Sequence, residues 1–161
     1  MREHGGGVSR RDVLRYAGTG AFAGGAMTIA LTRPATATPE AMQELIRRTA
    51  GGAPVTAGRV RLDIAPLSEN GNSVPCTVSV ESPMTAADHV RAIHLFNEKN
   101  PLPNVISVRL GPRAGRASLS TRIRLSETQE VIALAELSDG SFWFDRAIVI
   151  VTLGACLEDS V

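Results

Sequence analysis

The chain has 161 residues, of which 43% are hydrophobic, with 17 Lys and Arg against 16 Asp and Glu. Five of these basic residues and two of the acidic ones lie in the first 37 positions, so residues 38–161 carry 12 basic and 14 acidic groups, a net charge of about −2. That balance argues against a nucleic acid or an anionic membrane as the partner. The length suits one domain with a single core.

The first 37 residues have the layout of an export signal. Arg10 and Arg11 precede a Gly/Ala-rich apolar run over 16–31, and Ala35-Thr36-Ala37 offers a small-residue cleavage site. This arrangement is typical of a signal peptide, and the paired arginines favour the twin-arginine type. We therefore expect the mature protein to begin at Thr38 and to be periplasmic, with no membrane attachment after cleavage. The alternative is a retained anchor helix.

One short helix is predicted directly after the signal. Thr38 is a suitable N-cap, Pro39 suits the first helical position, and Met42 and Ile46 recur at helical spacing. The pair Gly51-Gly52 ends the segment.

From Val60 onward the hydrophobic period changes to two, which indicates strands with one wet face. Turn residues separate the apolar runs. The predicted strands cover residues 60–64, 74–80, 90–95, 106–110, 117–125, 131–137 and 147–153. We predict an all-β fold for residues 38–153: an immunoglobulin-like antiparallel β-sandwich of about seven strands with one short N-terminal helix.

The last predicted strand is apolar on both faces. Its odd-numbered positions, from Ala147 to Leu153, can fill the core, whereas Ile148 and Ile150 point the other way. An exposed apolar strip of this kind usually marks an interface with a partner. The alternative is that the N-terminal helix covers it.

The two cysteines have different settings. Cys76 alternates in register with Val74 and Val78, so we expect it to be buried and inert. Cys156 follows the last strand, where Glu158 and Asp159 disfavour its thiolate. A disulfide is the first hypothesis for two cysteines in an oxidising compartment. It would require the tail to fold inward until the Cα atoms are within about 7 Å.

Other chemistry-bearing residues do not form a recognisable catalytic or metal-binding pattern. His89 and His94 are five apart on one strand and face opposite sides, so they cannot share a metal locally. Zinc-type spacings and phosphate-binding glycine loops are missing from the sequence. We therefore expect no cofactor and no metal. Arg122 and Arg124 share a wet strand face, which is either a partner-facing or anion-facing surface or a plain solvated one.

Several stretches together resemble the SoxY family, the sulfur-carrier subunits of the bacterial thiosulfate-oxidising (Sox) system. They are Asn70-Gly71-Asn72-Ser73-Val74-Pro75, Val78-Ser79-Val80-Glu81-Ser82-Pro83-Met84-Thr85, Ile93-His94-Leu95-Phe96, Glu98-Lys99-Asn100-Pro101, Ser120-Thr121-Arg122-Ile123-Arg124-Leu125, Ala135-Glu136-Leu137-Ser138-Asp139-Gly140 and Val151-Thr152-Leu153-Gly154-Ala155-Cys156. The resemblance implies an immunoglobulin-like sandwich that forms a heterodimer with a SoxZ-like companion subunit.

The resemblance also implies that Cys156 carries sulfur intermediates covalently and that residues 154–161 are a C-terminal carrier arm. Such an arm is offered in turn to haem, hydrolase and dehydrogenase partner enzymes. The usual arm is Gly-Gly-Cys-Gly-Gly, whereas here Ala155 and Leu157 flank the cysteine and Glu158 and Asp159 follow. This departure, typical of a variant branch, puts the cargo and partners in question.

Three functions remain open from the sequence. The first is a covalent carrier that is not itself an enzyme. The second is a non-carrier interaction module whose divergent tail serves binding only. A stand-alone enzyme is the weakest, because no acid, base or metal constellation accompanies the thiol.

Overall fold

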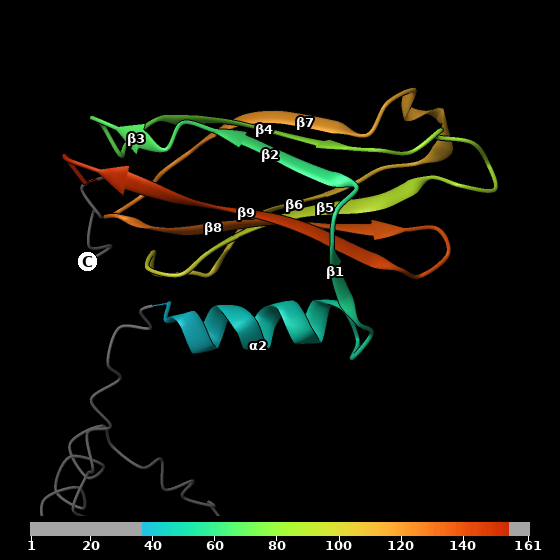
Figure 1. The fold of residues 1–161 in the computed structure, drawn as a ribbon, viewed down its shortest axis with the longest axis horizontal. Helices are drawn as coiled ribbons and strands as arrows, with labels where there is room; N and C mark the ends of the chain where they lie inside the picture. Colours follow the sequence, from blue (N-terminus) through green and yellow to red (C-terminus); the bar gives the residue numbers. More distant parts are fainter. Residues whose placement is uncertain (1–36, 155–161) are drawn as a thin grey trace, which may run out of the picture. The chain divides into compact units, whose positions relative to one another are not determined.

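The computed structural model describes residues 37–154 of the protein. The paired arginines of the predicted signal and Cys156 lie outside the described residues. The described part consists of two packed β-sheets with one helix against the outer face of the larger sheet (Figure 1).

The N-terminal helix forms where the sequence predicts it. Helix α2 spans Pro39–Thr49, with Pro39 in its first turn and Thr38 as its N-cap. The Thr38 hydroxyl accepts a hydrogen bond from the Ala41 N–H at 3.1 Å, which satisfies one of the free donors of the first turn. Met42 and Ile46 are the buried residues of the helix, so its apolar stripe faces the sheet.

The larger sheet has six strands. Its main path runs in the order β1 (Val55–Ala57), β9 (Phe142–Val151), β8 (Gln129–Leu137), β5 (Val90–Asn97) and β6 (Asn104–Arg109), and β3 (Leu67–Ser68) also pairs with β9. The smaller sheet has the order β2 (Val60–Ile64), β4 (Val74–Val80) and β7 (Ser118–Ile123). A 3₁₀ turn, η1 (Pro112–Ala114), precedes β7.

The predicted sandwich is therefore confirmed, and all seven predicted strands are present; β2 and β4 have the predicted ends and the other five have shifted ends. Two short strands, β1 and β3, were not predicted, and both pair in parallel with β9 although the other pairings are antiparallel. The last strand begins at Phe142 and ends at Val151. The prediction that Leu153 fills the core is wrong: its side chain is 70% exposed, because the chain has already left the sheet there.

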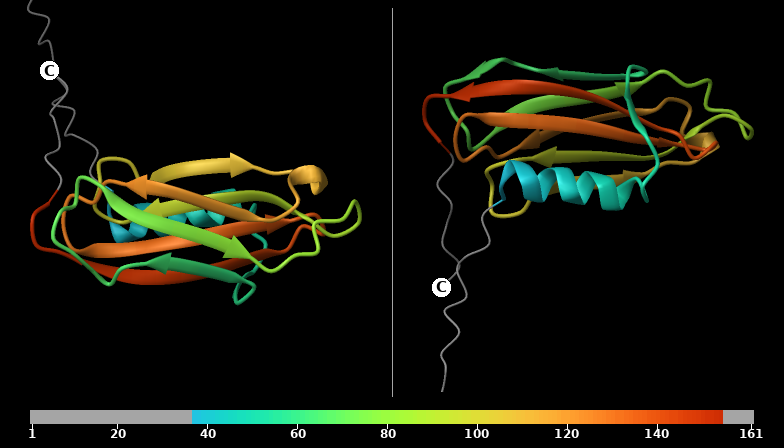
Figure 2. Two further views of the ribbon diagram at one scale, coloured as in Figure 1. Left: turned by 90° about the horizontal axis from the view of Figure 1, so that it is seen from above. Right: turned by 60° about the horizontal axis from the view of Figure 1, so that its bottom comes forward.

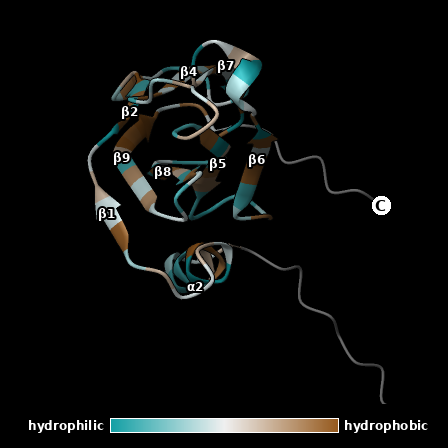
Figure 3. Cartoon of the chain, turned by 90° about the vertical axis from the view of Figure 1, so that its right-hand side faces the viewer, coloured by the Kyte–Doolittle hydropathy of each residue, from teal (hydrophilic) through white to brown (hydrophobic). Residues whose placement is uncertain are grey.

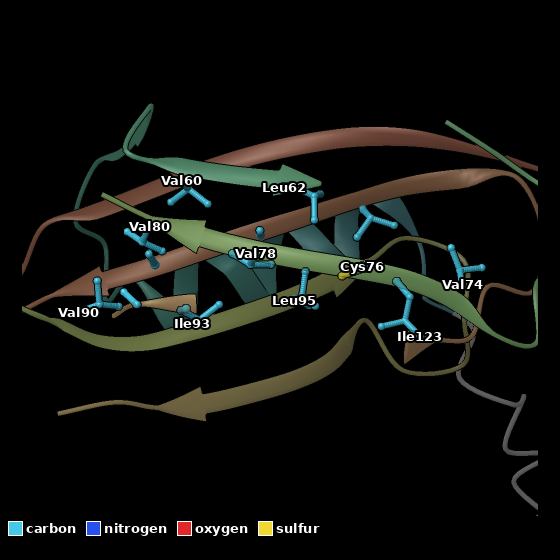
Figure 4. Close-up of a cluster of buried hydrophobic side chains, with 14 of the residues drawn as sticks. Val60, Leu62, Val74, Cys76, Val78, Val80, Val90, Ile93, Leu95 and Ile123 are labelled. Carbon is cyan, nitrogen blue, oxygen red and sulfur yellow. The ribbon is translucent and has the colours of Figure 1, made fainter. Parts of the chain in front are cut away.

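The main core fills the space between the two sheets. Val78 and Cys76 of β4 face Ile93 and Leu95 of β5, and all four are buried (Figure 4). Fully burying a side chain such as Val or Leu stabilises the fold by about 1.5–3 kcal/mol. A second cluster lies on the other face of the larger sheet, beneath α2. It contains Met42, Ile46, Ala50, Phe96, Ile132, Leu134 and Phe142.

The segment from β1 to β3 joins the two sheets. It pairs with the start of β9 at Val55–Ala57, crosses to pair with β4, and returns to the end of β9 at Leu67–Ser68 (Figure 2). Between these two pairings the carboxylate of Asp145 accepts hydrogen bonds from the N–H groups of Leu62 and Arg146, both at 2.8 Å. One side chain thus supplies the acceptors that a neighbouring strand would otherwise provide.

Candidate functional site

The arm root, residues 152–154, is the last part of the chain that the structure describes, two residues before Cys156. It leaves β9 beside the turn that precedes β4. The Thr152 N–H donates to the Ser68 carbonyl at 3.1 Å, and the Leu153 carbonyl accepts from the Gly71 N–H at 2.8 Å. The Thr152 hydroxyl also donates to the Glu69 carbonyl at 3.3 Å. These bonds hold the backbone of the root against the body of the domain.

At the arm root, the backbone of Gly154 lies very close to the backbone of Ser126. A Cβ atom placed on Gly154 would overlap the carbonyl oxygen of Ser126 and lie 3.1 Å from its carbonyl carbon. Real Cβ contacts are not that close, so the position requires the absence of a side chain. Because Gly154 has no side chain, the chain can pack against the β7–β8 loop at this point.

That loop is itself fixed to the same turn. The Leu125 N–H donates to the Gly71 carbonyl at 2.8 Å, and the Ser126 N–H donates to Asn100 Oδ1 at 3.1 Å. Gly71 therefore bonds both to the arm root and to the loop that Gly154 contacts.

The surface around the root combines exposed leucines with charged groups. Leu153 is 70% exposed and Leu102, in the β5–β6 loop, is 71% exposed. Lys99 Nζ lies 3.6 Å from Glu127 Oε2. Arg124, the first residue of the β7–β8 loop, is exposed as predicted.

Arg122 also lies on the exposed face of β7, with Ser118 and Ser120. Its guanidinium donates to Ser73 Oγ at 3.3 Å. The prediction that these residues share a solvent-exposed face is confirmed.

Cys76 is buried, as its register predicts. It is 3% exposed, lies within the main core and forms no disulfide with any described residue. Burial raises the pKa of the Cys76 thiol, and the nearby carboxylate of Asp63 raises it further. The thiol is thus a poor nucleophile in the folded protein.

The outer face of β9 carries the exposed apolar strip. Ile148 is 66% exposed and Ile150 is 51% exposed, as the sequence predicts. Leu67 of β3, opposite Ile150 in the parallel register, is 53% exposed and extends the strip. Sequence patterning missed Leu67, because a two-residue strand has no periodicity. Figure 3 shows hydrophobic segments on the ribbon of β9.

The alternative, that the N-terminal helix covers this strip, is wrong. Helix α2 packs on a cluster that includes Phe96, Ile132 and Phe142, near the start of β9. Ile148 and Ile150 lie further along the strand and stay exposed. The apolar strip, defined as Leu67, Ile148 and Ile150, is therefore free within the described chain.

The two histidines do not converge. His94 Nδ1 lies 2.8 Å from Ser107 Oγ, and its ring stacks on Phe96 with centroids 6.0 Å apart. Burial lowers the pKa of His94; Glu136 opposes this shift, and Arg109 adds to it. Among residues 37–154, no cluster of three or more His, Cys, Asp or Glu has the placement to hold a metal ion. In the same range no helix is long and apolar enough to cross a bilayer.

The fold and the arm root together define a β-sandwich whose last described residues, 152–154, leave the sheet at one end. The sequence matches the family described as "Sulfur oxidation protein SoxY" over residues 46–156, a match that runs through Cys156. The chain belongs to the SoxY family. Members of this family are carriers rather than enzymes, act with SoxZ and other Sox proteins, and are generally periplasmic.

Solved structures agree on the fold. The sulfur carrier protein SoxY from Chlorobium limicola f thiosulfatophilum is 24% identical, with a TM-score of 0.59 over 70% of this chain and 96% of that chain. A superoxide reductase (neelaredoxin) from Ignicoccus hospitalis is 15% identical, with a TM-score of 0.52 over 71% and 94%. A putative superoxide reductase from Thermotoga maritima is 17% identical, with a TM-score of 0.51 over 62% and 93%. The search of curated proteins found no match.

Proposed function

We propose that the protein is a periplasmic carrier that holds sulfur intermediates covalently on Cys156 and presents them to partner enzymes. The observation that carries the proposal is the arm root: the family match runs through Cys156, and the domain fixes the backbone two residues before it. In this proposal residues 1–37 are the twin-arginine signal, 38–153 the domain and 154–161 the carrier arm.

The chemistry at Cys156 is supplied by the partners. Joining a thiol to a sulfur anion forms an S–S bond and releases two electrons and the thiol proton, so the attachment step requires an electron acceptor. The haem partner that the resemblance implies fits this need. The cysteine contributes only its sulfur, and Glu158 and Asp159 beside it disfavour spontaneous thiolate attack. Hydrolase and dehydrogenase partners then act on the bound cargo.

A SoxZ-like companion subunit completes the proposal. The apolar strip supports it, because Leu67, Ile148 and Ile150 together expose a contiguous hydrophobic face on a strand and its paired neighbour. The strip lies on the strand that leads directly into the arm root, so a companion seated there would flank the arm.

The test is the mass of the protein isolated from a thiosulfate-oxidising bacterium whose own SoxY gene has been replaced. We expect sulfur-containing adducts on Cys156 when the cells grow on thiosulfate, none in Cys156→Ser, and unchanged adducts in Cys76→Ala. Growth on thiosulfate should be lost with Cys156→Ser. If Cys156→Ser supports growth as well as the wild type, the protein is instead an interaction module whose tail serves binding only.

A further inference from the structure

A polar region separate from the arm root lies at the opposite end of the sandwich. A hollow of about 440 Å³ forms where β5 begins and where β6 and β8 end. Its polar lining comes from His89, Arg91, Arg109 and Glu136, and Leu110 and Gly111 form part of its wall. None of these residues takes part in the proposed carrier chemistry.

The backbone around the hollow is held by hydrogen bonds. The Leu110 N–H donates to the Arg91 carbonyl at 2.8 Å, which ties the end of β6 to the start of β5. The His89 N–H donates to Ser138 Oγ at 3.1 Å, and the Ser138 N–H donates to the His89 carbonyl at 2.8 Å. The side chains that line the hollow therefore project from a fixed frame.

The charges in the hollow do not balance. Two guanidinium groups, of Arg91 and Arg109, face a single carboxylate, that of Glu136. The closest contact between them is long, 3.4 Å from Arg91 Nη1 to Glu136 Oε1. Arg109 forms no ion pair with any residue in the described range. The two guanidinium groups and the one carboxylate thus leave the hollow with an excess positive charge, without counting His89.

The wall next to the arginines leaves room for a ligand. At Gly111 an added Cβ would meet no atom within 4 Å, so the space beside it is open. Guanidinium groups present forked N–H donors that suit the oxygens of sulfate-like anions. We propose that this hollow is a non-covalent binding site for a small divalent oxyanion. Arg91 and Arg109 would bind the anion, and the carboxylate of Glu136 would limit the affinity of the site.

The affinity should be modest. Both arginines are exposed, and exposed ion pairs contribute little individually, so the dissociation constant should be on the order of millimolar. The site does not depend on Cys156, so the proposed carrier role and this site can fail separately. In a family of sulfur oxidation proteins, sulfate and thiosulfate are the natural probes.

The test is an NMR titration of the exported protein with sodium sulfate and with sodium thiosulfate, and with sodium chloride at matched ionic strength. We expect saturable shifts of the Leu110 and Gly111 amides with the divalent anions and not with chloride. Arg109→Gln should weaken binding by about fivefold or more, the factor that corresponds to the attraction between two unit charges about 4 Å apart in water. Glu136→Gln should strengthen binding by several-fold, on the order of the same factor.

Arg113→Gln is the matched control, because Arg113 is an exposed arginine of η1 that does not line the hollow. It changes the net charge by the same amount as Arg109→Gln and should leave the affinity within about twofold. Equal weakening by the two arginine variants would overturn the proposal, since it would show only a general charge effect. Shifts that do not saturate, or a Glu136→Gln variant that binds more weakly, would overturn it as well.

Discussion

Replacing Gly154 by alanine tests whether the domain fixes the arm root. The new methyl group would overlap the Ser126 carbonyl oxygen, and that carbonyl belongs to a loop bonded to Gly71 and Asn100. The loop cannot move without breaking those bonds. Leu153 and Gly154, at the end of the root, are exposed. We therefore expect the root, and not the loop, to move away from its position in the wild type.

The energies favour this outcome. Forcing an extra methyl group into a packed site costs about 1–3 kcal/mol. Releasing the root instead breaks the Gly71–Leu153 bond, which contributes about 1 kcal/mol net. Because 1.4 kcal/mol is a factor of about ten in an equilibrium, Gly154→Ala should raise the released population by roughly that factor. The global free energy of unfolding should fall by less than about 1 kcal/mol, since Leu153 and Gly154 are exposed.

The assay is the electron paramagnetic resonance spectrum of a nitroxide attached to Cys156, with Cys76 left unlabelled because it is 3% exposed. The spectrum should show restricted motion in the wild type and faster motion in Gly154→Ala. Leu153→Ala is the control, because it removes an exposed side chain beside the root and keeps the backbone bonds. An unchanged spectrum in Gly154→Ala, or a loss of stability as large as that of a core substitution, would refute the reasoning.

Three further predictions concern the companion, the signal and one histidine. Ile148→Asp should abolish binding of a SoxZ-like companion in co-purification, whereas Leu102→Asp, an equally exposed loop position, should not; equal loss in both would remove the apolar strip as the interface. Changing Arg10 and Arg11 to lysine should leave the protein in the cytoplasm on cell fractionation, and normal export would exclude the twin-arginine route. In the unfolded chain His94 takes up a proton near pH 6.5, whereas in the folded protein its pKa is lowered. The free energy of unfolding should therefore decrease as the pH falls below about 6.5. His94→Gln should make the free energy of unfolding, measured by urea unfolding at several pH values, less dependent on pH. An unchanged pH dependence in this variant would assign it to other groups.

The hydrophobic periodicity of the sequence was sufficient to predict the fold class. The alternation of Val74, Cys76 and Val78 predicts both strand β4 and the burial of its cysteine, and the structure confirms both. The N-cap at Thr38 likewise predicts where α2 begins. These features succeed because they depend on neighbours in the sequence.

Features that depend on distant neighbours were missed. Strands β1 and β3 exist because β9 has a free edge for them to pair with, and neither is long enough to show a period. Leu153 was assigned to the core by extending the alternation of β9, but the root turns away where it bonds to Gly71. The part of the site that the structure adds is Gly154, whose constraint comes from Ser126, a residue on another loop.

The parallel pairing of β1 with β9 has a consequence for how the protein is made. Val55 pairs with Phe142, so a strand at the start of the domain depends on one near its end. Such a fold has a high contact order and folds slowly, since the loop between the partners must close first. While it is being synthesised, the chain lacks the strand that receives β1 and β3. The ribosome must therefore have released almost all of the described chain before the larger sheet can be completed. If the protein is exported folded, as the proposed twin-arginine route requires, export has to wait until β9 has been synthesised.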